Sequence, residues 1–168
     1  MYKTLEYLEY VILLLFLVCF VLGKLWHMLM FAVLWYLLYG FVGLAERMVQ
    51  TGHRRLAQFY LALTCPYLLL PFRRAWYYML GILALPAEPA YPAQTALAMA
   101  QKLRPEALGN DNNRSYYYGI CAHVYTELGD LPQARSQLAR ARELKHNPGF
   151  DKMYGDIEAR ISKKEKSA

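Results

Sequence analysis

The sequence lacks the short motifs by which most enzymes and metal proteins are recognised. It contains no glycine-rich phosphate loop, no HExxH or GxSxG pattern and no CxxC pair. Its three cysteines, Cys19, Cys65 and Cys121, are scattered, and two of them lie within apolar runs. This spacing indicates neither a zinc site nor a disulfide framework, and instead suggests buried thiols in a reducing compartment. We therefore expect a protein without enzymatic activity, metal or cofactor.

The sequence also lacks an arginine-rich stripe with interleaved aromatic residues, which argues against a nucleic-acid partner. The positive charge is unevenly distributed. Residues 1–74 contain seven basic and three acidic residues, a net charge of +4, and the remainder contains twelve and ten, a net charge of +2. The basic residues therefore surround the most apolar part of the chain, where they suit lipid headgroups and membrane topology.

Two long apolar runs open the chain. Tyr7–Leu22 has no charged residue and would rise roughly 24 Å as a helix, while Leu25–Leu44 offers about 20 residues, the usual bilayer requirement. One continuous helix would extend roughly 60 Å, twice the hydrocarbon thickness, so a hairpin that turns at Gly23–Lys24 is favoured. No small-x-small cleavage pattern follows the first run. The sequence thus predicts a retained transmembrane hairpin over residues 1–45, in contact with a lipid bilayer.

A third apolar run, Leu56–Phe72, contains two prolines and is bracketed by Arg54–Arg55 and Arg73–Arg74. If it spanned the membrane, one arginine pair would lie outside, whereas otherwise all these arginines stay on the cytoplasmic side. We favour the second topology, although a third span stays open. Residues 46–73 are then a juxtamembrane segment whose helix ends near Cys65, because proline disfavours helix before it. This topology predicts a multi-pass protein of the cell membrane with a cytoplasmic C-terminal module.

The second half of the chain has the period of amphipathic helices. Apolar or small residues recur at steps of three and four on one face of a helix, at Leu131, Ala134, Leu138, Ala141 and Leu144. A similar face precedes it, at Tyr118, Cys121, Ala122, Tyr125 and Leu128. Gly129–Asp130 separates the two with turn chemistry. The pattern predicts a helical hairpin.

This arrangement resembles the tetratricopeptide repeat, with its pattern W-x2-L-G-x2-Y, A-x3-F, A and P over about 34 residues. The matching residues are Tyr118, Cys121, Ala122, Tyr125, Gly129, Ala134, Leu138 and Ala141, with a late proline at Pro148. A second copy over Arg74–Ala107 has Tyr77, Leu80, Gly81, Ala93, Leu97, Ala100 and Pro105 in register. This copy departs from the pattern at Ala84, where an aromatic is usual, and at Pro86, Pro89 and Pro92 around the turn.

A fainter third copy covers Phe41–Arg74. This copy has Leu44, Ala45, Gly52, Ala57 and Leu61 in register with the repeat pattern, whereas Met48 and Thr64 depart from it. If it is real, the second transmembrane helix continues directly into the first repeat helix, and Thr51–Gly52 is the turn. After the last repeat, one more amphipathic stripe consists of Phe150, Met153, Tyr154, Ile157 and Ile161. Stacked repeats need such a solvating end helix.

The sequence as a whole predicts an all-α protein. A transmembrane hairpin is followed by a short tetratricopeptide-like module over residues 74–163, which ends in a cap helix, and by a charged tail over residues 164–168. Such a short array gains stability by packing on the juxtamembrane helix or by pairing with a second copy as a homo-oligomer.

The resemblance also implies a binding site, because the first helix of each repeat lines a concave groove. The matching positions are Tyr116, His123, Thr126 and Glu127. The sequence itself shows only that they avoid the apolar stripe, and an ordinary solvated face is the alternative. Tyr116, Tyr117 and Tyr118 cannot all face one core, because adjacent helical positions point roughly 100° apart. At least one of these rings is therefore exposed or covered by a partner.

The predicted function is a membrane-anchored scaffold or adaptor that holds a protein partner, a peptide or helix, in the repeat groove. The alternative is a small accessory subunit of a membrane transport, export or pore complex, assembled through Lys24 and His27, with the repeats as a regulatory dock. A membrane enzyme that uses His27 or His53 has the least support, because neither histidine belongs to a catalytic pattern.

Overall fold

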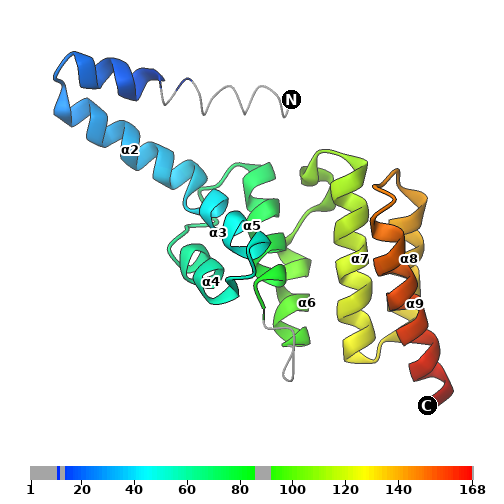
Figure 1. The fold of residues 1–168 in the computed structure, drawn as a ribbon. Coiled ribbons are helices and arrows are strands. Elements are labelled where there is room, and N and C mark those ends of the chain that lie inside the picture. The colour runs from blue at the N-terminus through cyan, green and yellow to red at the C-terminus, as the bar shows by residue number, and fades with distance from the viewer. Residues whose placement is uncertain (1–10, 12–13, 86–91, 168) are drawn as a thin grey trace. The chain divides into compact units, whose positions relative to one another are not determined.

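The computed structural model describes residues 11, 14–85 and 92–167, and these residues form helices and no strand (Figure 1). Residues 14–21 are helical and precede a turn at Gly23. The later elements are α2 (Leu25–Tyr39), α3 (Val42–Gln50), α4 (Arg54–Ala62), α5 (Pro71–Leu83), α6 (Ala93–Lys102), the 3-10 helix η1 (Pro105–Leu108), α7 (Asp111–Leu128), α8 (Leu131–Glu143) and α9 (Phe150–Ser167). The prediction of an all-α protein is confirmed.

The helices belong to two compact units, Met1–Tyr77 and Tyr78–Ala168, called here the N-terminal and C-terminal units. The boundary lies within α5, close to the predicted start of the repeat module at residue 74. Pro86 and Pro89, which were expected around the turn of the first repeat, lie outside the described residues.

The predicted transmembrane hairpin is not supported. Within the described residues, no helix combines the length and the apolar character needed to cross a bilayer. α2 has 15 residues, which rise about 22 Å, against a hydrocarbon core of about 30 Å. The predicted second span, Leu25–Leu44, is interrupted by a turn at Gly40 and Phe41. In the predicted first span, residues 7–10, 12 and 13 lie outside the described residues.

The assignment to the cell membrane as a multi-pass protein is contradicted by the same finding. The cytoplasmic placement of the C-terminal module followed only from that topology, and it loses its basis together with the spans. The physical reason is local. Gly40 has φ +52°, ends α2 and redirects the chain into α3, so a run that is continuous in hydropathy is not continuous as a helix.

In the N-terminal unit, α3 and α4 form a helical hairpin. Its turn lies at Thr51–Gly52, where Gly52 has φ +78°, as the fainter repeat copy predicted. Ala45 of α3 and Ala57 and Leu61 of α4 are buried between the helices. α4 ends at Ala62, shortly before the Cys65–Pro66 step, so a helix that ends near Cys65 is confirmed. However, α2 does not continue into α3.

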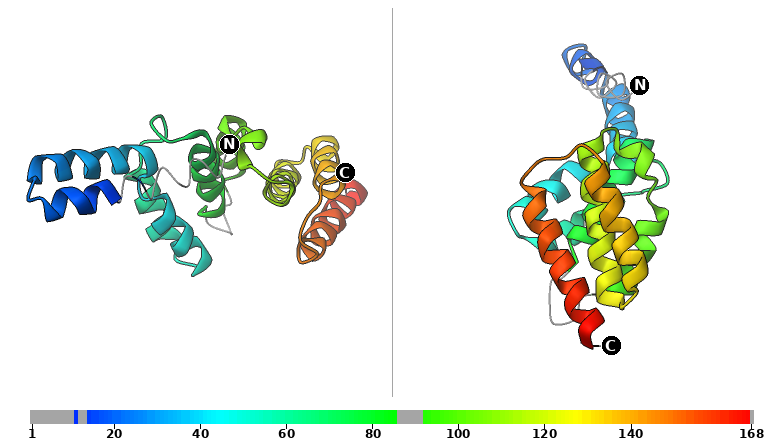
Figure 2. Two further views of the ribbon diagram at one scale, coloured as in Figure 1. Left: turned by 90° about the horizontal axis from the view of Figure 1, so that it is seen from above. Right: turned by 90° about the vertical axis from the view of Figure 1, so that its right-hand side faces the viewer.

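In the C-terminal unit, α7 is the central helix and packs against α6, α8 and α9. The right-hand view of Figure 2 shows α7, α8 and α9 side by side. α7 ends at Gly129, a left-handed residue with φ +81°. The carboxylate of Asp130 then caps α8 by accepting a hydrogen bond from Gln133 N at 3.2 Å. The predicted Gly-Asp turn is therefore confirmed, because glycine adopts this φ without steric penalty and aspartate satisfies a free N–H.

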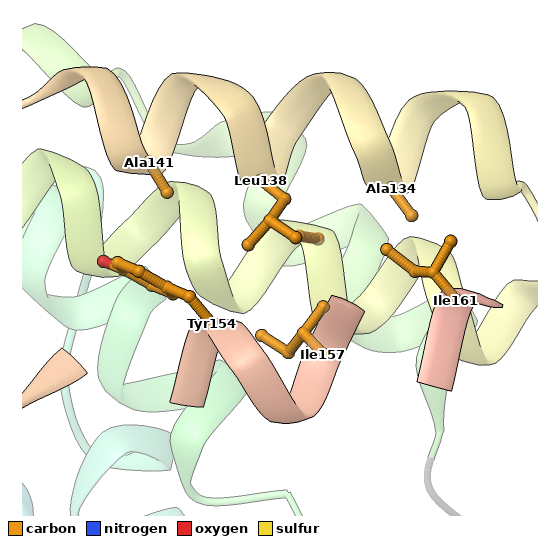
Figure 3. Packing of buried hydrophobic residues seen from close by; sticks show 7 residues of the cluster. Ala134, Leu138, Ala141, Tyr154, Ile157 and Ile161 are labelled. Atoms are coloured by element: carbon orange, nitrogen blue, oxygen red, sulfur yellow. The ribbon is translucent and has the colours of Figure 1, made fainter. Parts of the chain in front are cut away.

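One apolar cluster joins these three helices (Figure 3). Its buried residues are Ala122 of α7, Ala134, Leu138 and Ala141 of α8, and Tyr154, Ile157 and Ile161 of α9. The predicted α8 stripe and the predicted end helix are thus confirmed. α9 continues to Ser167, so most of the predicted charged tail is helical. The earlier helix pair follows its pattern less closely, because α6 buries Ala96 and Ala100 and leaves Leu97 half-buried.

Candidate partner-binding site

The three consecutive tyrosines of α7 have different neighbours. The Tyr116 ring stacks on Phe150 of α9 at a centroid distance of 5.0 Å. The Tyr117 hydroxyl donates to the carbonyl of Ala100 on α6 at 3.0 Å. Tyr118 packs against the cluster formed with α8 and α9. Each of the three rings therefore has a neighbour within the chain, while Tyr116 and Tyr118 remain partly exposed.

A hydrogen bond between two buried hydroxyl groups joins α9 to α7. Ser115 and Tyr154 both have an exposed fraction of 0 %. The Ser115 hydroxyl donates to the carbonyl of Ala141 at 2.6 Å and lies 2.6 Å from the Tyr154 hydroxyl oxygen. Since serine has one proton to donate, Tyr154 is the donor in the second bond. Gly119 makes room for this ring, because a Cβ there would lie 2.6 Å from Tyr154 Cε1.

Thr126, which was expected to face a groove, is fully buried. Its hydroxyl donates to the carbonyl of Ala122 at 2.7 Å, and its own carbonyl accepts from Lys164 Nζ at 2.7 Å. The lysine thus satisfies a backbone group near the negative end of the α7 dipole. Thr126 is therefore buried in this structure, and a partner contact at this position stays a prediction.

His123 and Glu127, the other two predicted residues on the last turns of α7, remain partly exposed. Glu127 Oε1 lies 3.5 Å from Arg160 Nη1 and 3.9 Å from His123 Nδ1, and Glu127 Oε2 lies 3.9 Å from Lys164 Nζ. These four residues are called here the charge cluster. Two cations from α9 face one carboxylate from α7, so the cluster has an excess of positive charge even when the histidine is neutral.

Burial lowers the pKa of His123, and the charges of Arg160 and Lys164 lower it further, whereas Glu127 acts in the opposite direction. The pKa in the unfolded chain is about 6.5. As the pH falls, the unfolded chain therefore takes up a proton before the folded protein does, and His123 lowers the stability of the folded protein below that pH.

His123→Gln tests this assignment. As the pH falls from about 7.5 to about 5.5, we expect the free energy of unfolding of this variant to decrease less than that of the wild type. Urea unfolding followed by far-UV circular dichroism measures this slope.

His146 provides a control, because its pKa is shifted in the opposite direction to that of His123. Its ring Nε2 lies 3.0 Å from Asp151 Oδ1, and hydrogen bonding to that carboxylate raises the pKa of His146. The folded protein then holds the proton more tightly, which adds stability below the unfolded pKa and removes it as the pH rises through the folded pKa. His146→Gln should therefore steepen the loss of stability at low pH. If both variants change the slope in the same direction, the assignment to His123 is wrong.

A separate pocket of about 70 Å³ lies between α6, α7 and α8. Its lining includes Leu97, Ala100, Tyr117, Cys121, Val124 and Gln137. Burial raises the pKa of the Cys121 thiol to about 11, so this thiol is protonated and a poor nucleophile at neutral pH.

Among the residues that the structure describes, no group of three histidine, cysteine, aspartate or glutamate side chains is arranged to hold a metal ion.

The residues singled out in the apolar half lie in the N-terminal unit, and the charge cluster belongs to the C-terminal unit. Lys24 and His27 are exposed at the start of α2, and His53 lies at the turn before α4, where its Nδ1 is 3.1 Å from Thr51 Oγ1.

Comparison with family models, curated proteins and solved structures gives no match to this chain. Arg160 and Lys164 are not among the residues predicted from the sequence, although their spacing of four beside the Ile157 and Ile161 stripe places both at one edge of α9.

Proposed function

We propose that the C-terminal unit is a tetratricopeptide-like interaction module that holds a segment of a protein partner along the seam between α7 and α9. The charge cluster supports this proposal. It contains His123 and Glu127, two expected groove residues that stay partly exposed, and Arg160 and Lys164 of α9 lie beside them. Tyr116 supplies an aromatic contact at the same seam, since it is half-buried against Phe150.

The electrostatics of the cluster favour a partner segment that presents a carboxylate. Arg160 is the most exposed member, at 55 % of its side chain, and its contact with Glu127 is long at 3.5 Å. A partner carboxylate can therefore pair with Arg160 without breaking a strong internal bond. Complementary charges of this kind give specificity and fast association more than raw affinity. An accessory role in a transport or export complex stays a prediction.

Opposed charge variants of the full chain test the proposal. Photo-crosslinking at Tyr116 followed by mass spectrometry should identify one recurrent partner segment that is rich in acidic residues. Its recovery should fall about tenfold with Arg160→Glu, because like charges now meet, and should rise with Glu127→Gln, because a competing carboxylate is gone. Loss of folding cannot explain a change in both directions.

Arg140→Glu is the matched control, since it makes the same charge reversal at an exposed position of α8. Recovery should be unchanged in this control. The adaptor proposal fails if Arg160→Glu and Glu127→Gln both leave recovery at the wild-type level, or if the Arg140→Glu control lowers it equally.

A further inference from the structure

The N-terminal unit exposes an apolar face on α4. Leu56, Phe59 and Leu63 are spaced by three and four residues, and all are exposed, Phe59 at 56 %. Ala57 and Leu61, which face α3, are buried. The outward side of α4 therefore carries large apolar side chains beside the polar ones. The loop that follows α4 also exposes Tyr67, at 80 %, and Leu68.

α2 presents a second apolar surface in the same unit. Its exposed large side chains are Leu25, Trp26, Leu29, Met30, Val33 and Leu34. Their spacing covers about half of the helix circumference. Isolated exposed apolar residues are ordinary, but several on one side of a helix indicate an interaction surface. Trp26, exposed at 79 %, and Tyr67 combine an apolar ring with a polar group, which is typical of residues at a lipid–water interface.

The charged residues around these surfaces are mostly basic. Residues 11–77 contain six basic residues and one acidic residue, Glu46, a net charge of +5. Glu46 accepts a hydrogen bond from Trp76 Nε1 at 3.1 Å, and Arg74 donates to the carbonyls of Tyr67 and Leu69. Arg47 and Arg55 are exposed. Arg55 lies one helical turn before Phe59, so a cation and an aromatic ring share one face of α4.

We propose that the N-terminal unit binds the surface of an anionic lipid bilayer, without crossing it, through the exposed face of α4 and the Tyr67–Leu68 loop. In this arrangement Phe59 and Leu63 insert at the boundary between headgroups and acyl chains, and Arg55 pairs with lipid phosphates. Short amphipathic helices with basic and aromatic residues bind in this way. The charge favours a lipid over a second copy of the chain, because two surfaces of the same sign repel each other.

Sedimentation of the full chain with vesicles tests this proposal. Phosphatidylcholine vesicles that also contain phosphatidylglycerol should bind the protein, and phosphatidylcholine vesicles alone should bind it much more weakly. Arg55→Gln should lower binding to the anionic vesicles about fivefold, and added salt should lower it further. Phe59→Gln should lower binding to both kinds of vesicle. All three tryptophans, at positions 26, 35 and 76, lie in this unit, so fluorescence reports binding directly.

Arg140→Gln on α8 is the matched control and should bind like the wild type. These substitutions are at exposed positions, and circular dichroism checks that each variant remains folded. Equal binding to both kinds of vesicle, or no effect of Phe59→Gln, would overturn the proposal. Self-association in sedimentation equilibrium without vesicle binding would assign the face to a second copy and overturn it as well. Arg160→Glu should leave vesicle binding unchanged, so this result is independent of the adaptor proposal.

Discussion

Tyr154→Ala is expected to lower the unfolding free energy of the C-terminal unit by about 3–5 kcal/mol. Tyr154 has an exposed fraction of 0 % and belongs to the buried cluster of α7, α8 and α9. Its removal leaves a cavity against Gly119, which has no side chain to fill it, and deprives Ser115 of its hydroxyl partner. Hydrogen exchange of peptides from α7, α8 and α9 in the full chain measures the loss.

Tyr154→Phe is the matched control, because it keeps the ring and removes only the hydroxyl. Ser115 still donates to the carbonyl of Ala141 in this variant, so the expected loss is about 1 kcal/mol. A loss of less than about 1 kcal/mol for Tyr154→Ala would show that α9 does not complete the core of this unit.

Gly40→Ala is expected to destabilise the N-terminal unit by about 2–4 kcal/mol. Gly40 has φ +52° and ψ −148°, a region that residues with a Cβ avoid. A Cβ there would also lie 2.5 Å from Thr64 Cγ2. Thr64 cannot rotate away freely, because its hydroxyl donates to the carbonyl of Tyr60 and accepts from Phe41 N. Tryptophan fluorescence during chemical unfolding follows this unit.

Gly43→Ala gives the comparison within the same unit. Gly43 lies in α3, and a Cβ there would meet no atom within 4 Å. This variant should raise stability by up to about 1 kcal/mol, because alanine is the better helix former. If the two substitutions have equal effects, the turn at Gly40 does not have the tight geometry described above.

The sequence predicted α8 and α9 well because each buries a single face. Ala134, Leu138 and Ala141 recur at helical spacing, and so do Tyr154, Ile157 and Ile161, and these residues form the cluster. The periodicity of an amphipathic helix contains this information directly. The Gly129–Asp130 turn was equally accessible, since turn chemistry is local.

The sequence did not predict exposure or helix ends correctly where these depend on residues distant in the chain. α7 is covered on more than one side, so one apolar stripe does not describe it, and Thr126 looked like a surface residue although α9 covers it. In the apolar half, hydropathy alone does not show that α2 ends at Gly40. That ending depends on Thr64, whose contacts with residues 40 and 41 arise only when the chain folds back.

The contacts of Tyr116 with α9, of Tyr117 with α6 and of Tyr118 with the buried cluster make α7 intolerant of insertions and deletions. One residue added or removed before this triplet would rotate each ring by roughly 100° and point it at the wrong neighbour. Variation in chain length should therefore accumulate in the connections on either side of α7, while α7 itself keeps a constant number of residues.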